Sequence, residues 1–138
     1  MEEEILGGKQ DLVELNHDPK VFAYPYGAAN AQVEEVVKGA FDGARGVEEG
    51  FNDKNTDRYL LYSWNASTMT LEKAKEVIDQ AIAEKKWVIF ILHKVDEGPD
   101  DTESISSELL EDILAYVNES NIEVVTASEG LAKLSEIE

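Results

Sequence analysis

Four short segments of the chain are almost continuously apolar, and they predict the strands of a sheet. They cover residues 21–24, 59–64, 87–92 and 122–127. Runs of this length that are rich in Val, Ile and aromatic residues are typical of strands covered on both faces, as in a parallel sheet. Residues 44–47 predict a weaker further strand, because glycines lie in and beside that segment.

Between these segments apolar residues recur at intervals of three and four, which predicts helices. The apolar stripes fall in residues 33–40, 71–82, 109–117 and 131–134. Asn30 and Thr70 are suited to cap the first two of these helices, and Thr126 with Glu129 has capping-box spacing. Residues 1–16 predict a ragged helix interrupted by two adjacent glycines. The acidic stretch 94–103, which contains Gly98 and Pro99, predicts a loop.

Strand-like and helix-like segments alternate along the chain, which favours an α/β architecture with parallel strands. No repeat or linker divides the sequence, so we expect residues 1–138 to form a single domain. In parallel α/β folds, sites form where strands end and the following loops begin. Residues 25–27, 64–65 and His93 occupy such positions and should share one face. His17 precedes its strand and should lie at the opposite end.

The charge of the chain excludes several classes of partner. Thirty acidic residues against 12 basic ones give a formal net charge of -18, which disfavours nucleic acid and anionic membrane surfaces. Solubility explains such acidity most simply, and a high-salt habitat is the sharper alternative. No apolar run reaches the length of a bilayer span, and the first residues lack the pattern of a secretory signal. With no Cys and two distant histidines, we expect no metal site in this chain.

Two strand ends carry residues suited to catalysis. His93 directly follows the most apolar segment, which suits a general acid or base, although a structural histidine is an equal alternative. Tyr24, Pro25, Tyr26 and Gly27 form a strand-to-helix turn whose amides could stabilise an oxyanion. A plain turn punctuated by Pro and Gly explains the same pattern and is favoured on pattern alone.

Two further residues are candidates for binding a substrate. Trp64 could form the wall of a pocket, but a Trp at a strand end more often packs in a core or at its rim. Arg45 lies among small residues and could orient a carboxylate, whereas a surface ion pair is the more common role of such a residue.

Taken together, four pieces of the sequence resemble the polysaccharide deacetylases of carbohydrate esterase family four. The pieces are residues 22–27, 44–45, 87–95 and 124–131, and their order and spacing match. The resemblance runs from about residue 5 to the end. It implies a partial (β/α) barrel with about four to five parallel strands and helices outside. It also implies a hydrolase that removes acetyl groups from amino-sugar polymers with the help of a divalent metal.

The resemblance assigns roles to individual residues. Residues 24–27 resemble the third motif, in which the Tyr26 amide would help to hold the oxyanion, with Pro25 and Gly27 beside it. His93 would be the general acid that protonates the leaving amine, and Leu92 would line the acetyl pocket. Trp64 would stand where the fourth motif has its pocket-lining Trp. The usual Arg of the third motif is replaced by Ala23, and Arg45 is our candidate to fill its place.

The departures from the family shape the expected function. The first two motifs, which supply the base and the metal ligands, have no counterpart here, so the resemblance implies a chain that begins after them. We therefore expect deacetylation only when another chain completes the site, by a homo-oligomer or a complementary protein. A non-catalytic glycan-binding or structural module, or a chance likeness in another small α/β protein, are the alternatives. The family suggests an extracellular or cell-surface location.

Overall fold

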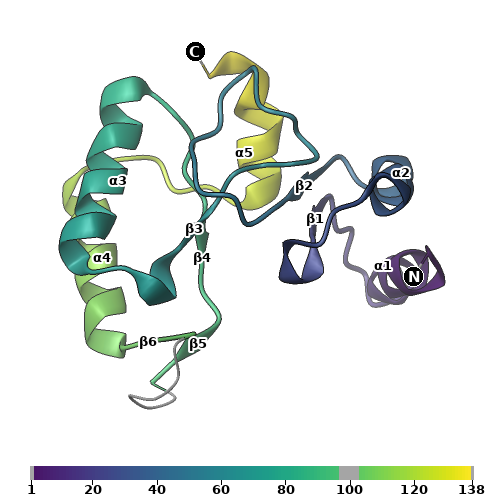
Figure 1. The fold of residues 1–138 in the computed structure, drawn as a ribbon, viewed down its shortest axis with the longest axis horizontal. Coiled ribbons are helices and arrows are strands. Elements are labelled where there is room, and N and C mark those ends of the chain that lie inside the picture. Colours follow the sequence, from purple (N-terminus) through teal and green to yellow (C-terminus); the bar gives the residue numbers. More distant parts are fainter. Residues whose placement is uncertain (1, 97–102, 138) are drawn as a thin grey trace.

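The structure, a computed structural model, describes residues 2–96 and 103–137 and is a mixed α/β fold (Figure 1). Its α-helices are α1 (Glu2–Glu14), α2 (Ala31–Ala40), α3 (Leu71–Glu84), α4 (Ser107–Glu119) and α5 (Ala127–Lys133). Its strands are β1 (Val21–Ala23), β2 (Gly43–Arg45), β3 (Trp64–Asn65), β4 (Phe90–Ile91), β5 (Lys94–Val95) and β6 (Ser104–Ile105). Short 3-10 turns are η1 (Pro25–Gly27), η2 (Ala66–Thr68) and η3 (Leu134–Glu136). Of the loop predicted at 94–103, residues 97–102 lie outside the described residues.

The strands pair in parallel, as the sequence predicted. β1 pairs with β2, β3 with β4 and β5 with β6. A parallel bridge joins Arg45 to Leu61, and the Trp64 amide donates to the Ile89 carbonyl at 2.8 Å. β1, β2, the segment 58–65 and β4 therefore follow one another as hydrogen-bonded neighbours. Within the described residues these strands form no closed barrel.

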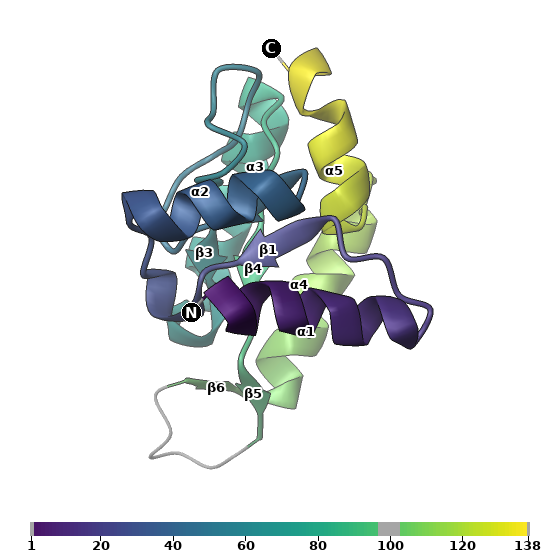
Figure 2. The same cartoon turned by 90° about the vertical axis from the view of Figure 1, so that its right-hand side faces the viewer.

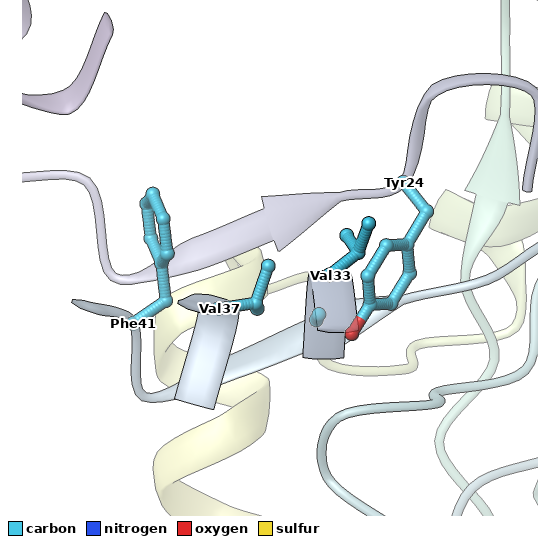
Figure 3. Close-up of a cluster of buried hydrophobic side chains, with 5 residues drawn as sticks. Tyr24, Val33, Val37 and Phe41 are labelled. Carbon is cyan, nitrogen blue, oxygen red and sulfur yellow. The ribbon is translucent and has the colours of Figure 1, made fainter. Parts of the chain in front are cut away.

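Helices cover both faces of this series of strands. On one face α2 packs against β1 and β2 through Tyr24, Val33, Val37, Phe41 and Ala44, four of which are labelled in Figure 3. On the other face α5 packs through Leu131 against Leu61 and Val21. Neighbouring residues of β1 thus serve opposite faces, because side chains alternate along a strand. The position of α5 differs from the arrangement with all helices outside that the family resemblance implied.

Helices α2, α3 and α5 begin at the capping residues that the sequence predicted. The side chain of Asn30 accepts hydrogen bonds from the first turn of α2, and that of Thr70 accepts one from α3. Thr126 and Glu129 form a capping box at the start of α5. α3 and α4 pack side by side around Ile78 and Ile113. The predicted helix caps at Asn30, Thr70 and Thr126 are therefore confirmed.

A buried asparagine holds the loops behind the strands together. The Asn52 side chain is fully buried and donates to the Tyr62 and Trp87 carbonyls at 3.0 and 3.2 Å. It also accepts a hydrogen bond from the Tyr62 amide at 2.9 Å. Because every bond goes to backbone, Asn52 fixes the segment 58–65 relative to the approach to β4.

The prediction of a strand at residues 122–127 is wrong. No backbone amide of residues 122–125 donates a hydrogen bond within the described residues, and Ala127 begins α5. Val124 is 76% exposed. A cavity of about 360 Å³ lies between this segment, β4 and the helices α3 and α4. The capping box at Thr126 fixes the end of the segment as a helix start, so the chain leaves the sheet direction there.

The amino-terminal helix also differs from the ragged, interrupted helix that the sequence predicted. α1 runs without interruption from Glu2 to Glu14 and packs against α2. Figure 2 shows it running alongside β1. Gly7 and Gly8 have open space around them, so their cost is the backbone entropy of glycine in a helix, about 1 kcal/mol each. Packing against α2 offsets that cost.

Candidate functional site

The carboxyl ends of the parallel strands lie at one edge of the series. The register places Ala23 beside Arg45, and Asn65 beside Ile91. The turn after β1, the end of β2, the end of β3 and the residues after β4 therefore follow one another along this edge. His17 precedes β1 and belongs to the opposite end. The two histidines are thus separated by the length of the strands.

The turn after β1 presents an amide that has no hydrogen-bond partner among the described residues. The Gly27 amide donates to the Tyr24 carbonyl and the Ala28 amide to the Pro25 carbonyl, both at 3.0 Å. No group of the described residues accepts a hydrogen bond from the Tyr26 amide. The two neighbouring bonds hold the turn in place while this amide stays unused. A fixed and unpaired N–H group is what an oxyanion donor requires.

Gly27 is required by the shape of this turn. Its φ is +69°, a backbone conformation that favours glycine. A Cβ on Gly27 would lie 2.3 Å from Cγ2 of Val47, far closer than real contacts allow. Val47 follows β2, so the turn after β1 is pressed against the chain that follows the neighbouring strand.

Tyr24 anchors the start of the turn. It is 2% exposed and packs with Phe22 and the α2 residues, with ring centroids of Phe22 and Tyr24 5.5 Å apart. Its hydroxyl has no hydrogen-bond partner within the described residues. Burial is the main cause that raises the pKa of the Tyr24 phenol, and the negative charge of Glu34 adds to it. The hydroxyl is therefore kept neutral and faces α2, away from the strand-end edge (Figure 3).

Arg45 closes the end of β2 as a half-buried cation. Its Nη1 donates to the Gly46 carbonyl at 3.3 Å, and burial lowers the pKa of its guanidinium. In the part of the chain that the structure describes, no carboxylate forms an ion pair with it. Because Gly43, two residues earlier, faces Leu131 of α5, alternation places Arg45 on the α5 face.

Trp64 lies on the opposite face from Arg45. Its partner in the register is Phe90, which packs with the α3 and α4 cluster. The Lys73 ammonium of α3 lies 5.5 Å from the Trp64 ring centroid, and the indole Nε1 donates to the Gly50 carbonyl at 2.8 Å. The Trp64 ring therefore packs toward α3. This is the packing role, in a core or at its rim, that is more common for a Trp at a strand end.

The end of β4 is more open than the end of β1. His93 is exposed, and its side chain makes no hydrogen bond to any of the described residues. Leu92 is 47% exposed and lines the cavity of about 360 Å³ beside α3 and α4. The apolar wall expected behind His93 is present in Ile91, which is buried. Nothing in the described structure orients the imidazole itself.

The candidate residues do not converge on a single described cavity. Pro25 and Tyr26 line a second cavity of about 610 Å³, which lies between α1 and β1 and is mostly apolar. Leu92 belongs to the other cavity, and Trp64 is turned toward α3. The structure thus gathers these residues along one edge but divides them between two described cavities.

Two polar residues lie on the same face as Arg45: Ser63, which the sequence analysis missed, and Asn65, which it placed at a strand end without a role. Ser63 is buried and donates to the Gly46 carbonyl at 2.8 Å, which ties β2 to the next segment. Asn65 accepts a hydrogen bond from the Ser67 amide at 3.0 Å. Leu61 of the segment 58–65 packs toward α5. Because side chains alternate along an extended segment, residues 63 and 65 lie on the same face as Leu61. This period-two alternation could have placed both residues on this face from the sequence.

The described residues do not fit a metal ion. Among residues 2–96 and 103–137 no group of three His, Asp or Glu side chains could hold one.

No helix in this part of the chain is both long and apolar enough to cross a membrane. Comparison with protein-family models, with curated proteins and with solved structures found no match for the chain. The deacetylase resemblance therefore rests on the sequence motifs and stays a prediction.

Proposed function

We propose that this chain is the C-terminal part of a polysaccharide deacetylase-like domain, with the strands forming part of a (β/α) barrel. It would deacetylate acetylated amino-sugar polymers when another polypeptide segment completes it. The observation that carries the proposal is the Tyr26 amide, which has no partner among the described residues and is held in a fixed turn at the carboxyl edge of parallel strands. Parallel α/β folds place their sites at this edge.

In this proposal the chain supplies the oxyanion side and the acid side of the site. The Tyr26 N–H would donate to the oxygen of the tetrahedral intermediate, and Pro25 and Gly27 would hold that donor in position. His93 would protonate the leaving amine, with Leu92 beside the acetyl group. Arg45 would receive a polar or negative group of the substrate. Trp64 packs toward α3 and Gly50, so it is not part of the proposed site.

The base and the metal would come from the completing segment. Because the described residues offer no ligand group for a divalent ion, no step of the reaction is assigned to a metal held by this chain. One oxyanion donor contributes roughly 3–4 kcal/mol of transition-state stabilisation, which is a small part of what enzymes supply. We therefore propose that the chain alone has little or no activity.

The outer edge of β1 is the place where we propose that completion occurs. Phe22 and Tyr24 use their backbone groups toward β2, so those of Val21 and Ala23 point away from it. No backbone hydrogen bond reaches Val21 or Ala23 from the described residues. Natural proteins usually pair or cover such an edge. The cavity between α1 and β1 opens beside it.

Acetate release tests the proposal. The full chain is mixed with a polypeptide that carries the Asp-Asp and His-x-x-x-His motifs of the family, with a tetramer of N-acetylglucosamine as substrate. We expect release by the mixture that falls at least about a hundredfold in His93→Ala, the usual scale for a lost general acid. His17→Ala is the matched control and should keep the activity of the unmodified chain. No acetate from any such pairing would overturn the catalytic proposal.

A non-catalytic glycan-binding module is the second candidate. It is favoured by the exposure of His93 and by the absence of any group among the described residues that orients its imidazole. A module of this kind would bind an acetylated polymer equally well with and without a chelator. His93→Ala would leave that binding unchanged. An extracellular or cell-surface location remains part of both proposals.

A further inference from the structure

Tyr26 presents its aromatic ring to solvent at the strand-end edge. The exposed fraction of the residue is 102%, so no neighbour shields it. No other large hydrophobic residue of the described chain is as exposed; Val124 follows at 76%. Aromatic residues usually bury most of their surface, so a fully exposed ring calls for an explanation.

The backbone of Tyr26 is held in an unfavourable conformation. Its φ is 57° and its ψ is 17°, in the left-handed region that a bulky side chain enters at a cost in stability. Pro25 on one side and Gly27 on the other fix the turn, and Val47 packs against Gly27. Glycine or asparagine would occupy this position with less strain. A tyrosine kept there and turned outward points to a role outside folding.

We propose that the Tyr26 ring is a stacking surface for one sugar ring of a neutral polysaccharide. This inference rests on the proposed function and adds a binding residue to its site. The face of a pyranose ring whose hydroxyl groups are equatorial carries C–H groups, which pack on the electron-rich face of an aromatic ring. Such contact needs no charge, so the net charge of -18 does not oppose it.

The position of the ring fits a polymer that is to react at this edge. The same residue carries the unpaired amide proposed to receive the acetyl oxygen, so a sugar held on the ring lies close to that amide. The residues that would meet a completing strand, Val21 and Ala23, lie in β1 before the turn. A glycan therefore fits Tyr26 better than the completing polypeptide does.

Nuclear magnetic resonance with a tetramer of N-acetylglucosamine tests the inference. We expect Overhauser contacts between the Tyr26 ring protons and sugar C–H protons in the full chain. Tyr26→Phe keeps the ring and should keep the affinity within about twofold, whereas Tyr26→Ala should weaken binding by about tenfold or more. Leu15→Ala is the control, because Leu15 is an exposed apolar residue before β1, at the other end of the strands.

The stability of a second variant separates a binding role from a structural one. Tyr26→Gly relieves the left-handed strain, so we expect a higher thermal midpoint together with the same loss of sugar binding as Tyr26→Ala. Equal affinity of Tyr26→Ala and the unmodified chain, or no binding by the unmodified chain, would overturn the inference. So would a ring that loses contact with sugar and is buried when the completing polypeptide is added. Tyr26-dependent binding without acetate release would keep this inference and remove the catalytic proposal.

Discussion

The two strand ends proposed to carry the chemistry differ in how completely they are built. After β1, two hydrogen bonds, a proline and a closely packed glycine fix the turn around Tyr26. After β4, His93 is exposed and has no hydrogen-bond partner among the described residues. Tyr24 at the first end is buried against α2, whereas Leu92 at the second is 47% exposed.

This difference indicates which part of the site can work without help. The turn after β1 is supported by the α2 cluster and by the chain after β2, so its amide is already positioned. The end of β4 faces a cavity and an unpaired segment, 122–125, instead of a further strand. A general acid needs orientation, and here that orientation must come from outside the described contacts. In the proposed site, the oxyanion side would therefore be preformed and the acid side would not.

The largest expected effect comes from breaking the preformed end. Gly27→Ala places a methyl group against Val47 in a backbone conformation that disfavours it. We expect a loss of about 2–4 kcal/mol in the free energy of unfolding, measured by urea denaturation. Gly39→Ala is the matched control, because Gly39 lies within α2 with open space around it. That change should stabilise by about 1 kcal/mol. Equal effects of the two substitutions would show that the turn is not fixed by packing.

Relieving the strain at Tyr26 should have a smaller effect of opposite sign. Tyr26→Gly removes a bulky residue from the left-handed region and buries no less surface, since the ring is exposed. We expect a gain of about 1 kcal/mol in the same denaturation experiment. A loss of stability would mean that the ring supports the turn, which contradicts its proposed role.

Alkaline titration tests the burial of Tyr24. The raised pKa of Tyr24 favours the neutral phenol in the folded state. The contribution of this group to the free energy of unfolding is therefore present below the ordinary pKa of 10.0 and is lost as the pH rises through the raised value. The unmodified chain should therefore lose more stability than Tyr24→Phe above about pH 10. At neutral pH the two should differ by less than about 1 kcal/mol, because the hydroxyl has no partner to lose. Parallel loss of stability in both chains at high pH would contradict this burial.

The smallest effects are expected at the end of β4. His93→Ala and Leu92→Ser alter exposed side chains and should each change the free energy of unfolding by less than about 0.5 kcal/mol. Denaturation under the same conditions as for Gly27→Ala gives the comparison. A loss comparable with that of Gly27→Ala would show that this end is as firmly built as the other.

The sequence predicted well where local signals and packing agree. Asn30, Thr70 and Thr126 cap the helices as expected, and the segments 21–24 and 87–92 contain parallel strands. It failed at residues 122–127, whose apolar pattern suits a strand but whose capping box begins a helix. Whether a strand-like segment pairs depends on long-range packing, which a local pattern does not contain.

The candidate site was predicted only in outline. Strand order placed Tyr26, Arg45 and His93 at one edge, since parallel strands end together. The side of the sheet that each residue faces was not predicted, so Trp64 was kept as a candidate pocket wall although it packs toward α3, and Ser63 was overlooked. The close approach of Val47 to Gly27, next to the left-handed Tyr26, joins positions that lie 20 residues apart in the sequence, so a local pattern does not contain it.

Amide hydrogen exchange during completion tests the central claim most directly. The amides of Val21 and Ala23 point away from β2 and have no partner within the described residues. They should exchange rapidly in the chain alone and slow by at least about tenfold when the polypeptide with the missing motifs is added, while the Phe22 amide, paired with β2, changes little. Unchanged exchange at Val21 and Ala23 in a mixture that forms a complex would contradict completion at this edge.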